Sequence, residues 1–430
     1  MTESILITDA LIVAQGAGAA PFHGWVAVRD RKIAAVEAGA PPVRDGFDRV
    51  IAAEGGVLIP GLINTHAHSH STLTRGSAEG LPLEEWLPVI IGEMRRLTDA
   101  QAYCAALTTY AEALLSGTTC IVDMCLKPAV AARAAEALGI RVVIVPYVAD
   151  AMPIAPTLAD NQALLEHYGK AAGPVQVWVG LHELGTCSDA QVRDAVALAR
   201  RYGVGLHTHC SETRAAEAAT RERTGRSQVA HLDHLGALGP KTLLAHGVWL
   251  NDADQAMVAE RGTWIAHCPQ SNLKLGSGIA PVPAYRARGI KVALGTDGAK
   301  ANNRLDQFDT MKFASLLPKG IGCDATALLP GEVLDMATCD GAAALGLEAG
   351  RIAPGCVADL VLLRGDRVHL QPVLPDTIVT NLVHAARGGD VDTVLVDGKL
   401  VVESGRLVAM PEAELAHQAR DAATALLAGA

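Results

Sequence analysis

The chain has 430 residues, of which half are hydrophobic and 19% are charged, with a formal net charge of −10. This composition is typical of a globular protein with a large core, and the length allows a barrel-sized domain with a smaller one beside it. The acidic balance and the 3% of aromatic residues argue against a nucleic-acid partner, and no apolar run is long enough to span a bilayer.

The first residues lack the basic segment that begins a signal peptide. The nine cysteines are scattered and include no Cys-x-x-Cys pair, which in a chain of this length indicates reduced thiols rather than a disulfide framework. We therefore expect a cytoplasmic protein that has no membrane partner.

The two ends of the chain carry short β patterns without helices. Strands are predicted within 4–13, 24–36 and 50–52 near the start. The pattern returns at 358–363 and 393–402, where Asp397-Gly398 predicts a tight turn. We expect residues 1–57 and 357–430 to form one small β-sandwich domain from both termini, with a closing helix over 410–430.

The middle of the chain, residues 58–356, alternates β-branched runs with Ala-rich amphipathic stretches. Strands are predicted at 57–65, 118–124, 141–148, 175–182, 204–209, 242–246, 263–267 and 291–296. Helices are predicted at 99–115, 128–138, 189–202 and 252–261, and helix C-cap glycines at Gly139, Gly203, Gly262 and Gly289. Such alternation predicts a parallel sheet, and eight repeats favour a distorted (β/α)8 TIM barrel in an α/β protein.

Polar side chains stand where the predicted barrel strands end. The first strand leads into His66-Ala67-His68, and alternate side chains of a strand point the same way. Later strands end at His182, His209, His246, His267 and Asp297. Because the carboxyl ends of barrel strands form the active-site face, we expect these groups to converge. Two imidazoles side by side at a buried strand end suit one transition-metal ion.

Glu212 is the second informative residue, because it lies just beyond the strand that ends at His209. At that place a carboxylate can face a metal-bound water, accept its proton and pass it to a leaving group. The sequence thus predicts hydrolytic acid–base chemistry beside the metal.

These motifs resemble the amidohydrolase superfamily in its mononuclear subtype. They are most similar to the aminohydrolases that deaminate S-adenosylhomocysteine and methylthioadenosine, whose relatives act on triazines, guanine and cytosine. The resemblance covers essentially the whole chain. It rests on Pro-Gly-Leu-Ile-Asn-Thr-His-Ala-His at 60–68, Leu-Glu-Glu-Trp-Leu at 83–87, His209 with Glu212, Ala-His at 245–246, His-Cys-Pro-Gln-Ser-Asn-Leu-Lys-Leu at 267–275 and Gly-Thr-Asp-Gly at 295–298.

The resemblance implies one divalent metal ion, zinc in the first place with iron(II) as the alternative. Its implied ligands are His66, His68, His209 and Asp297. A second metal is not expected, since no lysine stands at the end of the fourth strand to bridge two ions. The resemblance also makes Asp297 the acceptor of the water's proton, Glu212 the acid that protonates a ring nitrogen, and His246 the group that stabilises the oxygen of the tetrahedral intermediate. His207 becomes a second-shell or barrel-core residue.

For the substrate, the resemblance implies that Trp86 covers the pocket, that His182 contacts the ring, and that Glu93 holds ribose hydroxyls. Two departures from the adenosyl-type pattern stand out. Residues 181–185 read Leu-His-Glu-Leu-Gly instead of Pro-His-x-Pro-Tyr, and His70 replaces a small residue. These departures count against a ribosyl substrate and favour a smaller or differently decorated aminated heterocycle.

The predicted reaction replaces an exocyclic amino group of a nitrogen heterocycle with a carbonyl and releases ammonia. The ring is a purine, an adenosyl-type base, a pterin or a triazine. The alternatives are hydrolysis of a cyclic amide, a C–Cl bond or a substituted-amine C–N bond, and Glu212 favours deamination because ring-nitrogen protonation needs a carboxylate there. A non-catalytic binding protein would show gaps in the ligand set, and none is seen. The resemblance further implies a homodimer or homotetramer.

Overall fold

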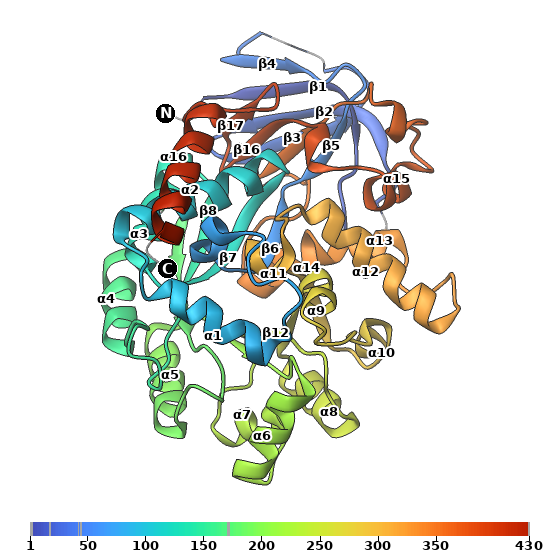
Figure 1. Cartoon of the computed structure of the whole chain (residues 1–430). Coiled ribbons are helices and arrows are strands. Elements are labelled where there is room, and N and C mark those ends of the chain that lie inside the picture. Colours follow the sequence, from blue (N-terminus) through green and yellow to red (C-terminus); the bar gives the residue numbers. More distant parts are fainter. Residues whose placement is uncertain (1–2, 17–18, 42, 44, 170–172, 429–430) are drawn as a thin grey trace.

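The computed structural model describes residues 3–16, 19–41, 43, 45–169 and 173–428. It has two parts, a β-sheet domain and a barrel of strands surrounded by helices (Figure 1). The first strands of the chain and the last ones lie side by side in the sheet domain, while the middle of the chain forms the barrel. Within the described residues, no helix is both long enough and apolar enough to cross a membrane.

The sheet domain contains strands from both termini, as predicted. Its strands are β1 (Ile5–Ile12), β2 (Phe22–Arg29), β3 (Lys32–Ala38), β4 (Arg49–Ala52), β5 (Val57–Pro60), β15 (Leu360–Leu363), β16 (Val391–Val396), β17 (Lys399–Glu403) and β18 (Arg406–Leu407). They form one sheet in the order β18-β17-β16-β15-β5-β1-β2-β3, with β4 paired to β1. The predicted sandwich is thus a single hydrogen-bonded sheet, because β5 pairs with both β1 and β15 and joins the two halves.

The barrel is built from parallel strands. They are β6 (Leu62–Ala67), β7 (Thr118–Cys125), β8 (Arg141–Pro146), β9 (Val175–Val177), β10 (Val179–Gly180), β11 (Leu206–Cys210), β12 (Thr242–His246), β13 (Trp264–His267) and β14 (Lys291–Leu294). The fourth predicted strand is broken into β9 and β10, since the Trp178 N–H bonds to Ile144 whereas the Val179 N–H bonds to Gly205. The barrel therefore consists of two arcs, β6–β9 and β10–β14, which agrees with the predicted distorted barrel.

Helices and short turns of helix cover the barrel. They are η1 (Ser69–Thr74), α1 (Leu83–Met94), α2 (Asp99–Leu115), α3 (Pro128–Leu138), α4 (Leu158–Tyr168), α5 (Asp189–Tyr202), α6 (Arg214–Thr224), α7 (Gln228–His234), α8 (Asp252–Arg261), α9 (Pro269–Lys274), α10 (Val282–Ala287), α11 (Ala299–Asn302), α12 (Gln307–Gly322), α13 (Pro330–Met336) and α14 (Cys339–Leu345). The bounds of α2, α3, α5 and α8 match the prediction. Gly139, Gly203 and Gly262 cap α3, α5 and α8 with positive φ, where a side chain would be strained.

The predicted strand over 57–65 is two strands with different neighbours. β5 belongs to the sheet domain and β6 to the barrel, and Gly61 lies between them against Thr119, where a Cβ would come within 2.0 Å of the Thr119 hydroxyl. The Gly61 N–H donates to the Asp359 carbonyl of the sheet domain at 2.8 Å. The chain therefore changes domain within one residue, and β6 then carries His66 to the barrel's open end.

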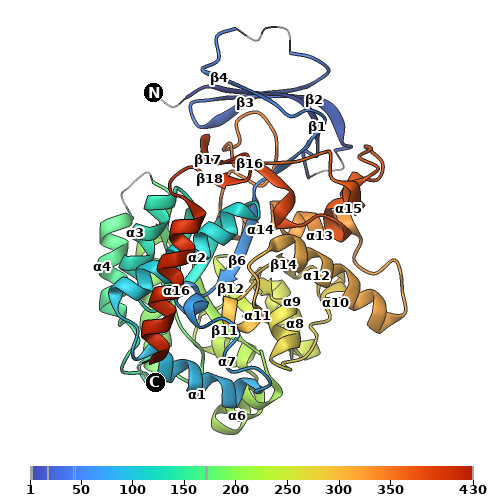
Figure 2. The same ribbon diagram turned by 45° about the horizontal axis from the view of Figure 1, so that its top comes forward.

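The C-terminal part adds η2 (Val368–Leu370), α15 (Ile378–His384), η3 (Gly388–Asp390) and α16 (Glu412–Ala428). Helix α16 leaves the sheet domain and lies along α2 on the side of the barrel (Figure 2). Its Leu426 packs with Leu73 and Leu97 next to η1 and α1. The predicted closing helix therefore packs against the barrel, beside the elements that surround the site.

Candidate active site

The histidines at the end of β6 are oriented by hydrogen bonds to their inner nitrogens. His66 is fully buried, and its Nδ1 lies 2.8 Å from Nε2 of His207. His207 in turn places its own Nδ1 2.8 Å from the Leu243 carbonyl, so this Nδ1 carries the proton and Nε2 accepts from His66. The His66 Nε2 atom therefore has a free lone pair, and although it is buried it has no hydrogen-bond partner among the described residues.

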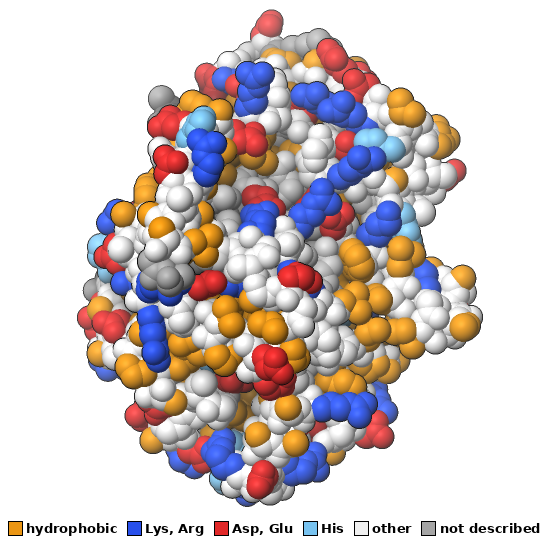
Figure 3. All heavy atoms as spheres, viewed as in Figure 1, with side chains coloured by type: hydrophobic (Ala, Val, Ile, Leu, Met, Phe, Trp, Pro, Cys, Tyr) orange, Lys and Arg blue, Asp and Glu red, His pale blue; other side chains and the backbone are white. Residues whose placement is uncertain are grey.

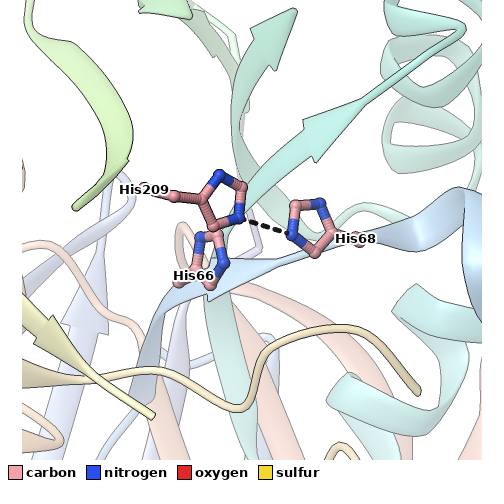
Figure 4. A group of neighbouring side chains, drawn as sticks. All are labelled: His66, His68 and His209. Atoms are coloured by element: carbon pink, nitrogen blue, oxygen red, sulfur yellow. Dashed lines mark hydrogen bonds between the residues drawn. The ribbon is translucent and has the colours of Figure 1, made fainter. Parts of the chain in front are cut away.

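The same arrangement holds for His68 and His209. His68 Nδ1 donates to the Met124 carbonyl at 2.7 Å, and His209 Nδ1 donates to the His182 carbonyl at 2.8 Å. Their Nε2 atoms face each other at 3.2 Å, with His66 beside them (Figure 4). The lone pairs of these two Nε2 atoms repel each other at that distance unless a positively charged group lies near them. Three converging imidazole nitrogens thus fit a metal cation.

Asp297 completes this group from the loop after β14. Its Oδ1 lies 3.4 Å from Nε2 of His68 and 3.7 Å from Nε2 of His66. Its other oxygen accepts a hydrogen bond from Ser271 at 2.5 Å, and its backbone has a φ of 63°, a conformation that few non-glycine residues adopt. The predicted ligands His66, His68, His209 and Asp297 are thus brought together, and their chemistry suits one divalent ion.

Glu212 and His246 lie beside this group. The Glu212 Oε2 atom is 3.5 Å from Nε2 of His246, and its Oε1 accepts a hydrogen bond from Ser277. Burial raises the pKa of Glu212, His246 opposes that shift, and the charge of Asp297 adds to it. His246 donates through Nδ1 to Oδ1 of Asn272 at 2.9 Å, which holds its Nε2 toward Glu212. Burial therefore favours the protonated form of Glu212 more than in an ordinary exposed glutamate.

A cavity opens over these residues, and α1 forms its cover. Trp86, Leu87, Ile90 and Met94 of α1 line it, as Trp86 was predicted to do. One end of α1 is held by the Thr213 hydroxyl, which donates to Glu84 at 2.9 Å. The open volume is about 60 Å³, whereas small-molecule sites usually hold roughly 300 Å³ or more. The open space in this structure is therefore smaller than that of a typical small-molecule site.

Of the other predicted substrate residues, His182 lies in the cavity wall and Glu93 does not. The His182 ring stacks on Tyr147 at 4.3 Å, and burial lowers its pKa to about 3, so the ring is neutral. The Glu93 carboxylate is instead bound by Lys300 at 2.6 Å. Lys300 is fully buried in α11, shortly after Asp297, and a buried ammonium needs a carboxylate partner, which is why Glu93 points away from the cavity.

His70 and His267 have different surroundings. His70 lines the cavity, buried beside His68 and Tyr147, and its Nδ1 has no hydrogen-bond partner among the described residues. His267 ends β13, where burial lowers its pKa and His246 is near enough to add to that shift, but it does not line the cavity.

Four residues that sequence reasoning did not assign contribute to the site. Ser271 and Asn272 orient Asp297 and His246, while Tyr147 and Glu183 line the cavity. Ser271 and Asn272 stand inside the motif at 267–275, so their position in that motif was an available signal. Tyr147 is the first residue after β8, and Glu183 follows His182. The sequence has no distinctive pattern at either position.

The chain belongs to the amidohydrolase family, whose model matches residues 57–401. It is 40% identical to a 5′-deoxyadenosine deaminase of Methanothermobacter thermautotrophicus over 429 residues, 99% of each chain. It is 39% identical to a 5-methylthioadenosine/S-adenosylhomocysteine deaminase of Desulfitobacterium hafniense over 88% of each. A crystal structure of an adenosine deaminase from Xanthomonas campestris with bound zinc superposes with a TM-score of 0.93 at 30% identity, covering 99% of this chain and 98% of that one.

These relatives confirm the predicted class. The protein is an enzyme, an amidohydrolase-type hydrolytic deaminase of an aminated nitrogen heterocycle. The similar proteins are named for adenosine-type nucleosides. The departures at residues 181–185 and at His70 predict instead a smaller or differently decorated aminated heterocycle, and that expectation stays a prediction.

Proposed function

We propose that this enzyme deaminates an adenosine-type nucleoside, converting the exocyclic amino group of the purine to a carbonyl with release of ammonia. The observation that carries the proposal is the juxtaposition of three converging imidazole nitrogens with Asp297, and of the Glu212–His246 pair beside them. The names of the similar enzymes support an adenosine-type substrate.

We assign the metal site to His66, His68, His209 and Asp297 and propose a single ion, zinc in the first place and iron(II) as the alternative. Zinc is supported by the zinc-bound Xanthomonas relative and by the N-rich donor set. A bound ion of this kind supplies Lewis acidity, which makes a water acidic enough to attack near neutral pH.

The protein's own residues handle the protons. Asp297 orients the attacking water and accepts its proton, while Ser271 holds the carboxylate. Glu212, whose burial favours the protonated form, donates a proton to a ring nitrogen and makes the adjacent carbon electrophilic. His246, fixed by Asn272, stabilises the oxygen that develops at that carbon. We assign contact with the base to Trp86 and His182, which both line the cavity.

The test is ammonia release by the purified enzyme, reconstituted with zinc, from 5′-deoxyadenosine, methylthioadenosine and adenosine. Guanine, a pterin and a triazine serve as comparison substrates. We expect deamination of the nucleosides and loss of activity with a chelator. If only the comparison rings release ammonia, the substrate is not an adenosine-type nucleoside. If none of the six compounds releases ammonia, the proposed deamination is overturned.

We further propose a cytoplasmic homo-oligomer, either a dimer or a tetramer. The nine cysteines are free thiols, as in a reducing compartment. Hydrophobic side chains gather on the side of the molecule where α12 lies (Figure 3), and Phe313, Leu316 and Ile321 of α12 are exposed. Such a patch is typical of a protein interface. Light scattering on the wild type and on Phe313→Glu tests this, and a monomeric wild type would refute it.

A further inference from the structure

Glu183 is a carboxylate in the cavity wall that the proposed reaction does not use. It follows His182 beyond β10, and no hydrogen bond to its carboxylate is found within the described residues. Burial raises the pKa of Glu183 to about 7, and the charges of Glu212 and Glu84 add to this effect. An unpaired carboxylate in such a place costs stability, so a substrate-related role explains its presence better than a structural one.

The cavity has acidic groups but offers no cation to an anionic substrate. No lysine or arginine is found among the described residues that line it. Lys300, in the neighbouring helix α11, is paired with Glu93. A divalent ion would offset Asp297 and Glu212, which leaves the charge of Glu183 without a partner.

We propose that Glu183 is a specificity-determining residue that accepts a hydrogen bond from a hydroxyl or amino group of the substrate and selects neutral or cationic nucleosides over anionic ones. This inference rests on the proposed function. A phosphate or carboxylate tail would meet Glu183 with no compensating cation, and repulsion of that kind produces specificity as effectively as attraction does. A protonated amine would pair with Glu183 and gain a charge-assisted hydrogen bond.

The experiment compares kcat/KM values for four substrates at pH 8, where Glu183 is ionised. They are 5′-deoxyadenosine, the cationic 5′-amino-5′-deoxyadenosine, the anionic adenosine 5′-monophosphate, and methylthioadenosine as a neutral substrate with a bulky tail. Each is measured with wild type, Glu183→Gln and the control Glu85→Gln. Glu85 is exposed on α1, and within the described residues its carboxylate makes no hydrogen bond or ion pair, so its change removes a charge outside the cavity.

We expect the wild type to prefer the amine and to use the phosphate poorly. In Glu183→Gln, the preference for the amine over 5′-deoxyadenosine should fall about tenfold and relative use of the phosphate should rise about tenfold, equivalent to about 1.4 kcal/mol each. The ratio of methylthioadenosine to 5′-deoxyadenosine should not change, and Glu85→Gln should match the wild type throughout.

Substrate ratios that are the same in Glu183→Gln and the wild type would overturn the role of Glu183 while leaving deamination intact. So would a wild type that uses the phosphate as well as it uses methylthioadenosine. Absence of ammonia from all four nucleosides would overturn the proposed function instead. Melting temperatures of the variants show whether any loss of activity reflects unfolding.

Discussion

The hydrogen bond between His207 and the proposed metal ligand His66 predicts the effect of replacing His207. His207 touches no substrate, but its Nε2 is the acceptor for the Nδ1 proton of His66, and burial lowers the His207 pKa to about 3, which keeps that acceptor unprotonated. In His207→Leu the His66 N–H has no acceptor at a position with 0% exposure. Either this buried donor stays unsatisfied, or the tautomer changes and the proton moves to Nε2, where it blocks metal binding.

The size of the effect follows from that geometry. An unsatisfied buried donor costs about 1–3 kcal/mol, and loss of a hydrogen bond behind a metal ligand typically costs about 10–100-fold in affinity. We therefore expect zinc to bind His207→Leu about 10–100-fold more weakly. His207→Gln should recover part of the loss, because its amide oxygen can accept from His66. At saturating zinc, kcat should stay close to the wild-type value.

The assay is competition for zinc against a chromophoric chelator, together with kcat measured as zinc is added. The control is His231→Leu, which removes another buried histidine on α7 whose partner is Asp189 and which is not part of the cavity wall. Zinc affinity within threefold of the wild type in His207→Leu would refute the argument. Equal weakening in the control would show that the effect is a general loss of stability.

Three further predictions concern Glu212, the Lys300–Glu93 pair and Glu183. Glu212→Gln should keep its zinc while kcat falls about 10²–10⁴-fold, measured by metal analysis and ammonia release; loss of the metal would mean that its role is ligation. Lys300→Met should lower stability by about 3–5 kcal/mol by leaving Glu93 buried and unpaired, and adding Glu93→Leu should restore most of it; melting curves that show no such recovery would contradict the pairing. Glu183→Gln should stabilise the protein at pH 8 but little at pH 5. The pKa of Glu183 rises from 4.5 to about 7 on folding, so the folded state binds the proton more tightly than the unfolded state does. The free energy of unfolding therefore falls as the pH rises between these two values. Above pH 7 the full loss of stability, up to about 3 kcal/mol, applies. A melting-temperature difference between Glu183→Gln and wild type that is the same at both pH values would contradict this.

The sequence by itself determined the class of the fold and most of the reactive centre. Ala-rich helical patterns ending at Gly139, Gly203 and Gly262 alternate with β-branched runs, and short-range periodicity of this kind is enough to indicate a parallel barrel. Because the carboxyl ends of barrel strands meet at one face, the order of polar residues along the chain was sufficient to predict that His66 and Asp297 converge.

Tertiary structure alone decided the features that depend on partners distant in sequence. The split of the first predicted strand at Gly61 depends on the close approach of Thr119, and the placement of Glu93 depends on the buried ammonium of Lys300. No local pattern encodes either contact. The same holds for Glu183, because only the tertiary structure shows that the described residues of the cavity wall include no lysine or arginine to pair with it. Local periodicity thus specifies the elements and their polar ends, whereas partner choice among buried charges is settled by packing.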